Sequence, residues 1–250
     1  MTLSEAELER YSRQLLMDDW GGAAQERLKS SRAMVIGAGA LGSPVCTYLA
    51  AAGVGSLGVV DGDVVELSNL HRQPLFMSPD VGAPKAEVAA IKLGLLNPEV
   101  LVEPFPAQLD AANAEAIVMG ADVVVDCTDS FESRYLVNDA CCAQGIALVE
   151  AGVVGFEGLV LAIRPGASAC YRCTFPTPTP PGARRSYREA GVLGAMAGIV
   201  GSIQALEALK LLSGVGEPLL DRILHIDGRD MGQTLVATSR RQGCQACAPE

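Results

Sequence analysis

Residues 33–52, AMVIGAGALGSPVCTYLAAA, decide the fold class of this chain. Ala33–Ile36 is an apolar run typical of a buried strand, and Leu41–Ala52 is typical of a helix. The GAGALG turn between them and Asp61, which ends the next predicted strand, are typical of a nucleotide site. Glycine lets the backbone approach a phosphate, the helix N-terminus offers free N–H groups, and an aspartate can accept hydrogen bonds from a ribose. A turn required only for packing is the alternative interpretation.

Apolar strands continue to alternate with helical stretches on both sides of this segment. Such alternation implies parallel pairing through right-handed crossovers. We therefore expect an α/β fold with a Rossmann-like, doubly wound, mostly parallel sheet and an antiparallel extension at its C-terminal end. The predicted strands are Ala33–Ile36, Leu57–Val60, Val100–Phe105, Val123–Asp126 and Ala147–Glu150, and the predicted helices between them are Leu41–Ala52, Lys85–Leu96, Ala111–Met119 and Glu132–Ala143.

The two ends of the chain differ from this pattern. Ser4 followed by Glu7 is a capping box, which predicts a helix over Glu5–Met17. After Gly158 the alternation weakens, and four prolines make Phe175–Arg185 irregular. We interpret residues 1–250 as one domain with a helical arm (1–30), a nucleotide-binding half (31–155) and a C-terminal half (156–250). The last of these contains Leu159–Ile163, an apolar helix over Leu193–Leu212, a short strand over Leu224–Ile226 and a cysteine-bearing tail.

Composition excludes several classes of function. The net charge is −10 and aromatic residues make up 4% of the chain, so nucleic-acid binding is not expected. The N-terminus lacks the basic and then apolar pattern of a secretory signal. The uncharged run from Ala33 to Val60 is long enough to span a membrane, but its glycines fit a strand, a turn and a packed helix better. We expect a cytoplasmic protein that does not bind membranes.

Polar residues after Asp61 separate two kinds of nucleotide site. Asn69, Arg72, Gln73 and Lys85 follow within 25 residues. A dinucleotide site, as in an NAD-dependent oxidoreductase, needs no such basic pair, whereas a triphosphate attacked at its α-phosphorus needs its growing charge neutralised. Each basic residue alone could be a surface charge, and their position after the turn favours the triphosphate.

Two acids follow the fourth predicted strand. Asp126 ends that strand and Asp129 lies just past it, at the sheet edge where ligands of open α/β sheets bind. Magnesium takes one or two carboxylates together with phosphate oxygens. Asp129 is the better candidate ligand, since Asp126 could equally contact a ribose or cap the following helix.

Two CxxC pairs lie outside the nucleotide half, at Cys170 and Cys173 and at Cys244 and Cys247. Paired thiolates from two knuckles suit a closed tetrahedral zinc site. An iron–sulfur cluster and unrelated core or redox cysteines are the alternatives. The other four cysteines, Cys46, Cys127, Cys141 and Cys142, are interpreted as small core residues. His71 and His225 have no partner at ligand spacing and are interpreted as structural.

Taken in order, GAGALG, VVDGD…SNLHRQ, VGAPKAE and DCTDS resemble the ThiF/MoeB/HesA family of ubiquitin-activating-type adenylyltransferases. The resemblance covers nearly the whole chain, including RYSRQ at residues 10–14, EAGV at 189–192 and both CxxC pairs. It implies that ATP and magnesium are used to adenylylate the C-terminal glycine of a ubiquitin-like sulfur-carrier protein, giving an acyl-adenylate and pyrophosphate.

The resemblance also assigns roles by position. Gly37, Gly39 and Gly42 would face the phosphates and Asp61 the ribose. Asn69, Arg72, Gln73 and Lys85 would bind the triphosphate, and Asp129 the magnesium. Arg13 would enter the site of the partner in a homodimer as an arginine finger. The Pro-rich segment Phe175–Arg185 would cross over the carrier tail, or alternatively be a mobile connector.

One position departs from the family. Tyr187 stands where some relatives carry a cysteine that forms a covalent link to the carrier or to sulfur. We therefore expect adenylylation without an enzyme-bound thioester or acyl-disulfide, with a separate protein as the sulfur donor because no rhodanese-like extension is present. Alternatives are a scaffold that binds a ubiquitin-like protein without catalysis, and activation of a carboxylate on a modified tRNA.

Overall fold

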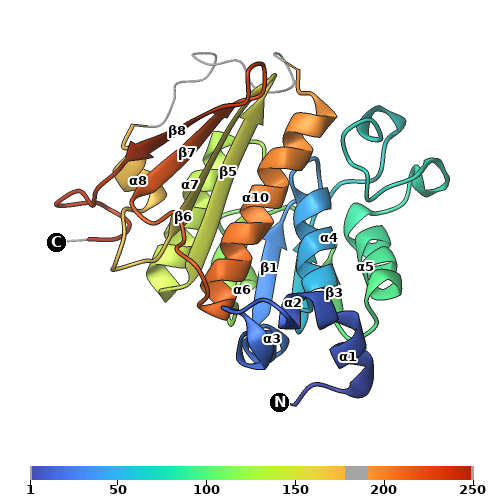
Figure 1. The fold of residues 1–250 in the computed structure, drawn as a ribbon. Helices are drawn as coiled ribbons and strands as arrows, with labels where there is room; N and C mark the ends of the chain where they lie inside the picture. Colours follow the sequence, from blue (N-terminus) through green and yellow to red (C-terminus); the bar gives the residue numbers. More distant parts are fainter. Residues whose placement is uncertain (1, 178–190, 249–250) are drawn as a thin grey trace.

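The computed structural model describes residues 2–177 and 191–248, which fold around one eight-stranded sheet (Figure 1). The strand order is β3-β2-β1-β4-β5-β6-β7-β8. The first five strands in this order pair in parallel and the last three pair antiparallel. The strands are β1 (Arg32–Ile36), β2 (Ser56–Val60), β3 (Leu101–Phe105), β4 (Val123–Asp126), β5 (Ala147–Val154), β6 (Glu157–Ile163), β7 (Arg222–Asp227) and β8 (Gly232–Ala237).

Helices cover both faces of this sheet, so the apolar interior is divided in two. The front core lies under α4, α5 and α10, and the rear core lies under α6, α7 and α8 (Figure 1). This arrangement confirms the predicted doubly wound, mostly parallel sheet with an antiparallel extension. The helices are α1 (Glu5–Arg10), α2 (Ser12–Leu15), α3 (Gly21–Ser30), α4 (Gly42–Ala52), α5 (Lys85–Leu96), α6 (Ala114–Val118), α7 (Phe131–Gln144), α8 (Tyr171–Thr174) and α10 (Gly194–Ser213), and the 3₁₀ turns are Leu67–Asn69 and Ser78–Asp80.

The N-terminal helix is shorter than predicted. The capping box forms as expected, because the Ser4 hydroxyl accepts the Glu7 N–H at 3.2 Å and the Glu7 carboxylate accepts the Ser4 N–H at 2.7 Å. The predicted helix Glu5–Met17 nevertheless breaks at Tyr11 into α1 and α2. The Tyr11 ring is buried, and its hydroxyl accepts a hydrogen bond from Asn97 Nδ2 at 2.9 Å. Docking of this ring onto the body bends the chain there.

Other elements also differ from the sequence analysis. α6 covers only the second half of the predicted helix Ala111–Met119, and β5 continues four residues beyond Glu150 to pair with β6. β8 was not predicted, because all its residues are exposed and carry no burial pattern. Of the predicted irregular segment Phe175–Arg185, all but the first three residues lie outside the described ranges.

The apolar helix α10 lies across the front of the sheet against α4. A Cβ on Gly201 would lie 2.5 Å from Pro44 Cγ and 2.7 Å from the Leu41 carbonyl oxygen, so this contact requires glycine. α10 and α4 therefore approach each other closely at this point. By length and composition α10 would also pass as a membrane span, but core helices of other proteins pass the same test, and 44% of its apolar window is buried.

Candidate active site

The turn between β1 and α4 is interlocked with the turn that follows β4. Gly37 has φ +95°, and a Cβ there would lie 2.9 Å from the Cys127 carbonyl oxygen. A Cβ on Gly42 would lie only 1.9 Å from the Gly37 carbonyl oxygen. Gly39 is less constrained, since a Cβ there would meet only Gln73 Nε2 at 3.6 Å. Two of the three glycines are therefore required by the backbone path itself.

Asp61 is fixed at the end of β2 by backbone N–H groups. Its Oδ2 accepts the Ala38 N–H at 2.8 Å, and its Oδ1 accepts the Asp63 N–H at 2.9 Å. Burial raises the pKa of Asp61, and the charge of Lys85 and the two N–H groups oppose that rise. An ionised carboxylate has about four lone-pair positions, so Asp61 retains acceptor capacity for hydroxyl groups of a ligand.

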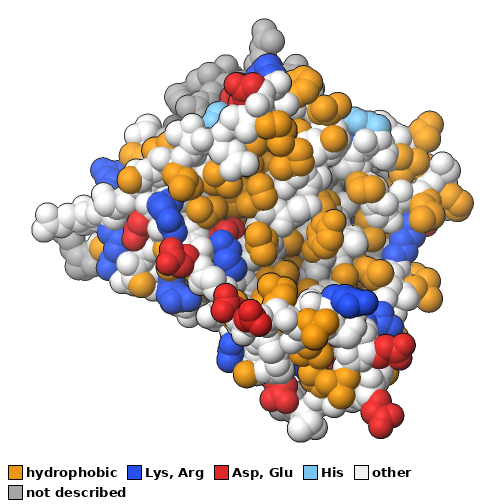
Figure 2. All heavy atoms as spheres, viewed as in Figure 1, with side chains coloured by type: hydrophobic (Ala, Val, Ile, Leu, Met, Phe, Trp, Pro, Cys, Tyr) orange, Lys and Arg blue, Asp and Glu red, His pale blue; other side chains and the backbone are white. Residues whose placement is uncertain are grey.

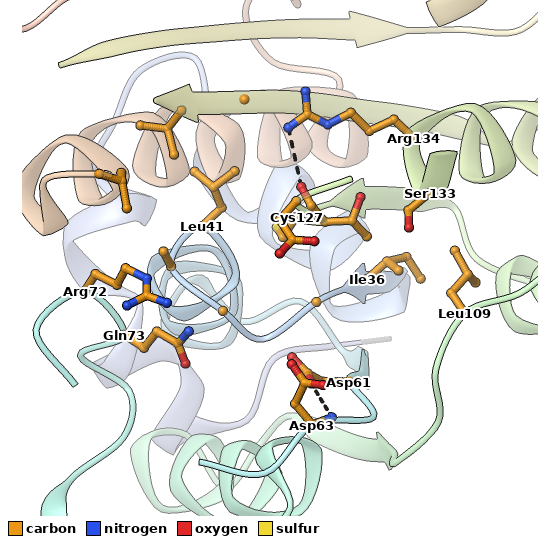
Figure 3. Close-up of a pocket in the computed structure, with 18 of the residues that line it drawn as sticks. Ile36, Leu41, Asp61, Asp63, Arg72, Gln73, Leu109, Cys127, Ser133 and Arg134 are labelled. Carbon is orange, nitrogen blue, oxygen red and sulfur yellow. Dashed lines mark hydrogen bonds between the residues drawn. The ribbon is translucent and has the colours of Figure 1, made fainter. Parts of the chain in front are cut away.

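Basic and amide side chains approach the same turn from the other side. Figure 3 shows Arg72 and Gln73 pointing toward the turn from one side, with Asp61 and Asp63 opposite. The Arg72 Nη1 donates to the Ser68 carbonyl oxygen at 2.8 Å. Lys85, the first residue of α5, is buried and lies 3.1 Å from the Asp63 carboxylate. These side chains therefore place two cations near a backbone turn that can accommodate phosphate.

One cavity of about 650 Å³ joins these groups. It extends from the glycine turn past the ends of β2 and β4 to the inner surface of β5 and β6. A cavity of this size accommodates a nucleotide-sized ligand. The predicted site residues that line it are Gly37, Gly39, Asp61, Arg72, Gln73, Lys85 and Asp129.

Four residues singled out from the sequence lie elsewhere. Gly42 is buried behind the turn and does not line the cavity. Asn69 does not line it either, because it closes a 3₁₀ turn whose Glu66 N–H donates to its Oδ1 at 3.3 Å. Asp126 is fully buried beneath the cavity, in contrast to Asp129. Arg13 is exposed on α2 and does not reach the cavity of its own chain.

The four cysteines of the CxxC pairs come together as one cluster. Their Sγ atoms all lie within 4.8 Å of one another. Three Sγ–Sγ distances are 3.8 Å (Cys170 to Cys173), 3.6 Å (Cys170 to Cys244) and 3.4 Å (Cys173 to Cys247). A disulfide requires about 2.05 Å, whereas thiolates about 2.3 Å from a tetrahedral zinc lie roughly 3.8 Å apart. The donor set and its dimensions fit zinc.

The protonation of one thiol also fits metal binding. Burial alone would raise the pKa of Cys244, but backbone N–H groups of Ala246 and Cys247 and the neighbouring thiols lower it to about 7. The pKa values of the other three cluster thiols, Cys170, Cys173 and Cys247, are raised, so Cys244 is the member that ionises most readily near neutral pH and is available as a metal ligand. The Cys173 sulfur also accepts the Arg241 N–H at 3.3 Å. The tail is thereby bonded to the α8 knuckle by its backbone as well as by its thiols.

The remaining cysteines follow the prediction. Cys46, Cys127 and Cys141 are buried, and burial raises the pKa of Cys46 to about 12 and those of the other two as well. Such thiols are unreactive core residues. Cys142 is only half-buried, and its thiol lies beside Cys170 at the metal cluster. It nevertheless packs against the rear core, in line with its interpretation as a core residue.

Comparison with known proteins identifies the family. The sequence matches the ThiF family over residues 11–246. The chain belongs to the ThiF family. It is 48% identical to the SAMP-activating enzyme E1 of Haloferax volcanii, over 99% of this chain and 91% of the relative. It is 46% identical to the sulfur carrier protein adenylyltransferase of Thermus thermophilus, over 100% of this chain and 94% of the relative.

A solved structure shares the fold. Escherichia coli MccB in complex with ATP superimposes with a TM-score of 0.87 at 25% identity, over 98% of this chain and 75% of that chain. The comparisons thus agree with the family inferred from the motifs. None of them supports an oxidoreductase or a non-catalytic scaffold.

Sequence reasoning missed part of the cavity wall of this ThiF-family chain. Arg134 lines the cavity from α7 (Figure 3). Its position five residues after Asp129, on the helix that follows the same strand, was the sequence signal that could have identified it. Gln108 lines it near Asp63 and donates to that carboxylate at 2.9 Å. His225 also lines the cavity, 3.8 Å from the Glu157 carboxylate. His225 reaches it through antiparallel pairing, which spacing along the sequence does not reveal.

Proposed function

We propose that this ThiF-family chain is an adenylyltransferase that uses ATP and magnesium to activate the C-terminal glycine of a ubiquitin-like sulfur-carrier protein. The observation that carries the proposal is one cavity in which Arg72, Lys85 and Asp129 lie with the glycine turn and Asp61. The names of the two relatives and the ATP complex of MccB support it. The products would be an acyl-adenylate and pyrophosphate.

The chemistry follows from the charges in the cavity. A carboxylate oxygen attacks the α-phosphorus of ATP, an O–P bond forms, and the bond to the pyrophosphate oxygen breaks. The nucleophile is ionised at neutral pH and needs no general base, so catalysis rests on positioning and charge neutralisation. The turn at residues 37–42 would face the phosphates, Asp61 would bind the ribose, and Arg72, Gln73 and Lys85 would bind the phosphate oxygens.

Asp129 is the proposed magnesium ligand, since it is the acid of the DCTDS segment that lines the cavity. Carboxylate and phosphate oxygens are the donors that magnesium prefers, and the bound ion would offset phosphate charge. Asn69 lies outside the cavity wall, so its proposed role is to shape the loop that carries Arg72 and Gln73.

A homodimer would supply Arg13 to the neighbouring site as an arginine finger, a contribution of roughly 10³–10⁵ in rate where measured. Exposed apolar side chains support such an interface. Leu16 and Met17 are exposed at the end of α2, and Tyr48 and Leu206 are exposed on α4 and α10. Figure 2 shows orange side chains over this face, with charged groups mostly around its margin.

The four-cysteine cluster would bind structural zinc and join the tail to α8 within the carrier-binding half, residues 156–250. The acidic chain is proposed to act in the cytoplasm, without nucleic acid or membrane, and to receive sulfur from a separate donor protein. The predicted absence of a covalent intermediate rests on Tyr187, and Tyr187 lies outside the described residues.

ATP–pyrophosphate exchange tests the proposal. Wild-type protein is assayed with a panel of carriers that end in Gly-Gly. Lys85→Ala should abolish exchange, whereas Lys92→Ala, seven residues along the same helix and paired with Asp80, should leave it intact. Arg72→Ala and Asp129→Ala should each abolish it without unfolding the protein. No exchange with any carrier would contradict catalysis, and NAD binding that survives loss of Arg72 and Lys85 would support an oxidoreductase instead.

A further inference from the structure

A cluster of ionisable groups lies beneath the cavity, on the rear face of the sheet. Asp126 and Glu150 are register partners on the parallel strands β4 and β5, and both are fully buried. Among the described residues one cation accompanies them, since Arg134 Nε lies 3.2 Å from Glu150 Oε1. Tyr171, Cys141 and Cys127 also lie close to the cluster, as neutral groups.

The charges of this cluster do not balance if both carboxyl groups are ionised. Two buried carboxylates and one buried guanidinium leave one negative charge without compensation, which costs several kcal/mol for a group removed from water. Within the described ranges, no hydrogen bond reaches Asp126 Oδ2 or either carboxyl oxygen of Glu150. One proton held between the two carboxyl groups balances the charge and gives two of these oxygens a hydrogen bond.

The same cluster holds the backbone that leads to the proposed magnesium ligand. Asp126 Oδ1 accepts the Thr128 N–H at 2.8 Å. Arg134 Nη2 donates to the Thr128 carbonyl oxygen at 3.5 Å, as the dashed line in Figure 3 marks. The N–H and the carbonyl of Thr128, the residue before Asp129, are thus hydrogen-bonded to Asp126 and Arg134. Both of these side chains contact Glu150.

We propose that Glu150 is a positioning residue, which shares one proton with Asp126 and through Asp126 and Arg134 fixes the Thr128–Asp129 turn at the floor of the cavity. Glu150 does not line the cavity, so it touches neither substrate nor metal. Burial is the main cause that raises the pKa of Glu150 well above its ordinary value, and the charge of the adjacent Asp126 is the second. A neutral acid at this position agrees with that direction. The link to catalysis rests on the proposed function, whereas the shared proton does not.

Two substitutions of Glu150 separate positioning from packing. Glu150→Gln keeps the shape, the donor to Asp126 and the charge balance with Arg134, while Glu150→Ala removes the donor. In ATP–pyrophosphate exchange, Glu150→Ala should lower turnover ~10- to 100-fold, as displaced catalytic groups do, and should raise several-fold the magnesium concentration that gives half-maximal rate. Glu150→Gln should restore both to within about threefold of wild type.

Two readouts are independent of activity. In infrared spectra the wild type should show the carbonyl stretch of a protonated carboxyl group, which shifts in D₂O and is missing from both variants. The amide hydrogens of Thr128 and Asp129 should exchange faster in Glu150→Ala than in wild type or Glu150→Gln. If wild type catalyses no exchange, the proposed function fails while these two readouts still decide the proton and the turn.

Three results would overturn the proposal. The first is a wild-type spectrum without the acid band. The second is a Glu150→Ala variant that is only less stable and keeps the wild-type magnesium dependence and amide exchange. The third is a Glu150→Gln variant as impaired as Glu150→Ala.

Discussion

Gly42→Ala offers a direct test of the interlocked turn. The added Cβ would lie 1.9 Å from the Gly37 carbonyl oxygen, a backbone atom, and real Cβ contacts essentially never fall below 3.0 Å. The two must therefore separate by more than an ångström, which moves α4 against the glycine turn. Overpacking of this kind costs about 1–3 kcal/mol, which for a chain of this length lowers the melting temperature by about 2–12 °C.

Gly94→Ala is the matched control. Gly94 lies inside α5, and a Cβ there would meet nothing within 4 Å. The same substitution should stabilise this helix by about 0.5–1 kcal/mol, because alanine loses less backbone entropy than glycine. Thermal unfolding followed by circular dichroism should therefore show a lower melting temperature for Gly42→Ala and a higher one for Gly94→Ala. A Gly42→Ala variant that melts at or above the wild-type temperature would refute the geometry of the turn.

Three further predictions concern the metal cluster, the N-terminal cap and the dimer. Cys244→Ser should lose bound zinc and more than about 3 kcal/mol of unfolding free energy, whereas Cys46→Ala should keep the metal; atomic absorption and denaturant unfolding measure both. Burial alone would raise the pKa of Glu7, but hydrogen bonds from a lysine on α3 and from the N-cap serine outweigh it and lower that pKa. The Glu7 carboxylate therefore stabilises the folded state fully above the ordinary glutamate pKa. This stabilisation is lost as pH falls through the lowered pKa of Glu7. Glu7→Gln should cost about 1 kcal/mol at pH 7, and the difference from wild type should shrink with acidification; an undiminished difference would contradict the assignment. Equal mixtures of inactive Arg13→Ala and Asp129→Ala chains should regain about a quarter of wild-type exchange if each site uses both subunits, and no recovery after subunit exchange would argue against the finger.

The parallel half of the fold could be predicted because its strands are buried on both faces. Such strands appear in the sequence as short apolar runs, and the glycine turn fixes how the first run meets its helix. The observed bounds of β1, β2 and β4 lie within a residue of those predicted, and those of α5 coincide. β8 carries no such pattern, because its exposed residues are defined as a strand only by pairing with β7.

The candidate site could be predicted where it depends on strand ends. Asp61 and Asp129 follow the carboxyl ends of parallel strands, and the fold class alone places these at one edge of the sheet. Asn69 illustrates the limit, since its local 3₁₀ turn directs the side chain to its own backbone. Glu150 and Arg134 were missed because their contact depends on which residues of β4, β5 and α7 meet, and the sequence does not give that register.

The sheet keeps the two cores apart, and the cysteine cluster belongs to only one of them. Cys170, Cys173 and Cys244 are members of the rear core, whereas α4 and α10 pack in the front core. Withdrawal of a metal would therefore loosen one layer and leave the other intact, a subglobal opening rather than complete unfolding. A protease added to metal-depleted protein should then cleave first near α8 and the tail.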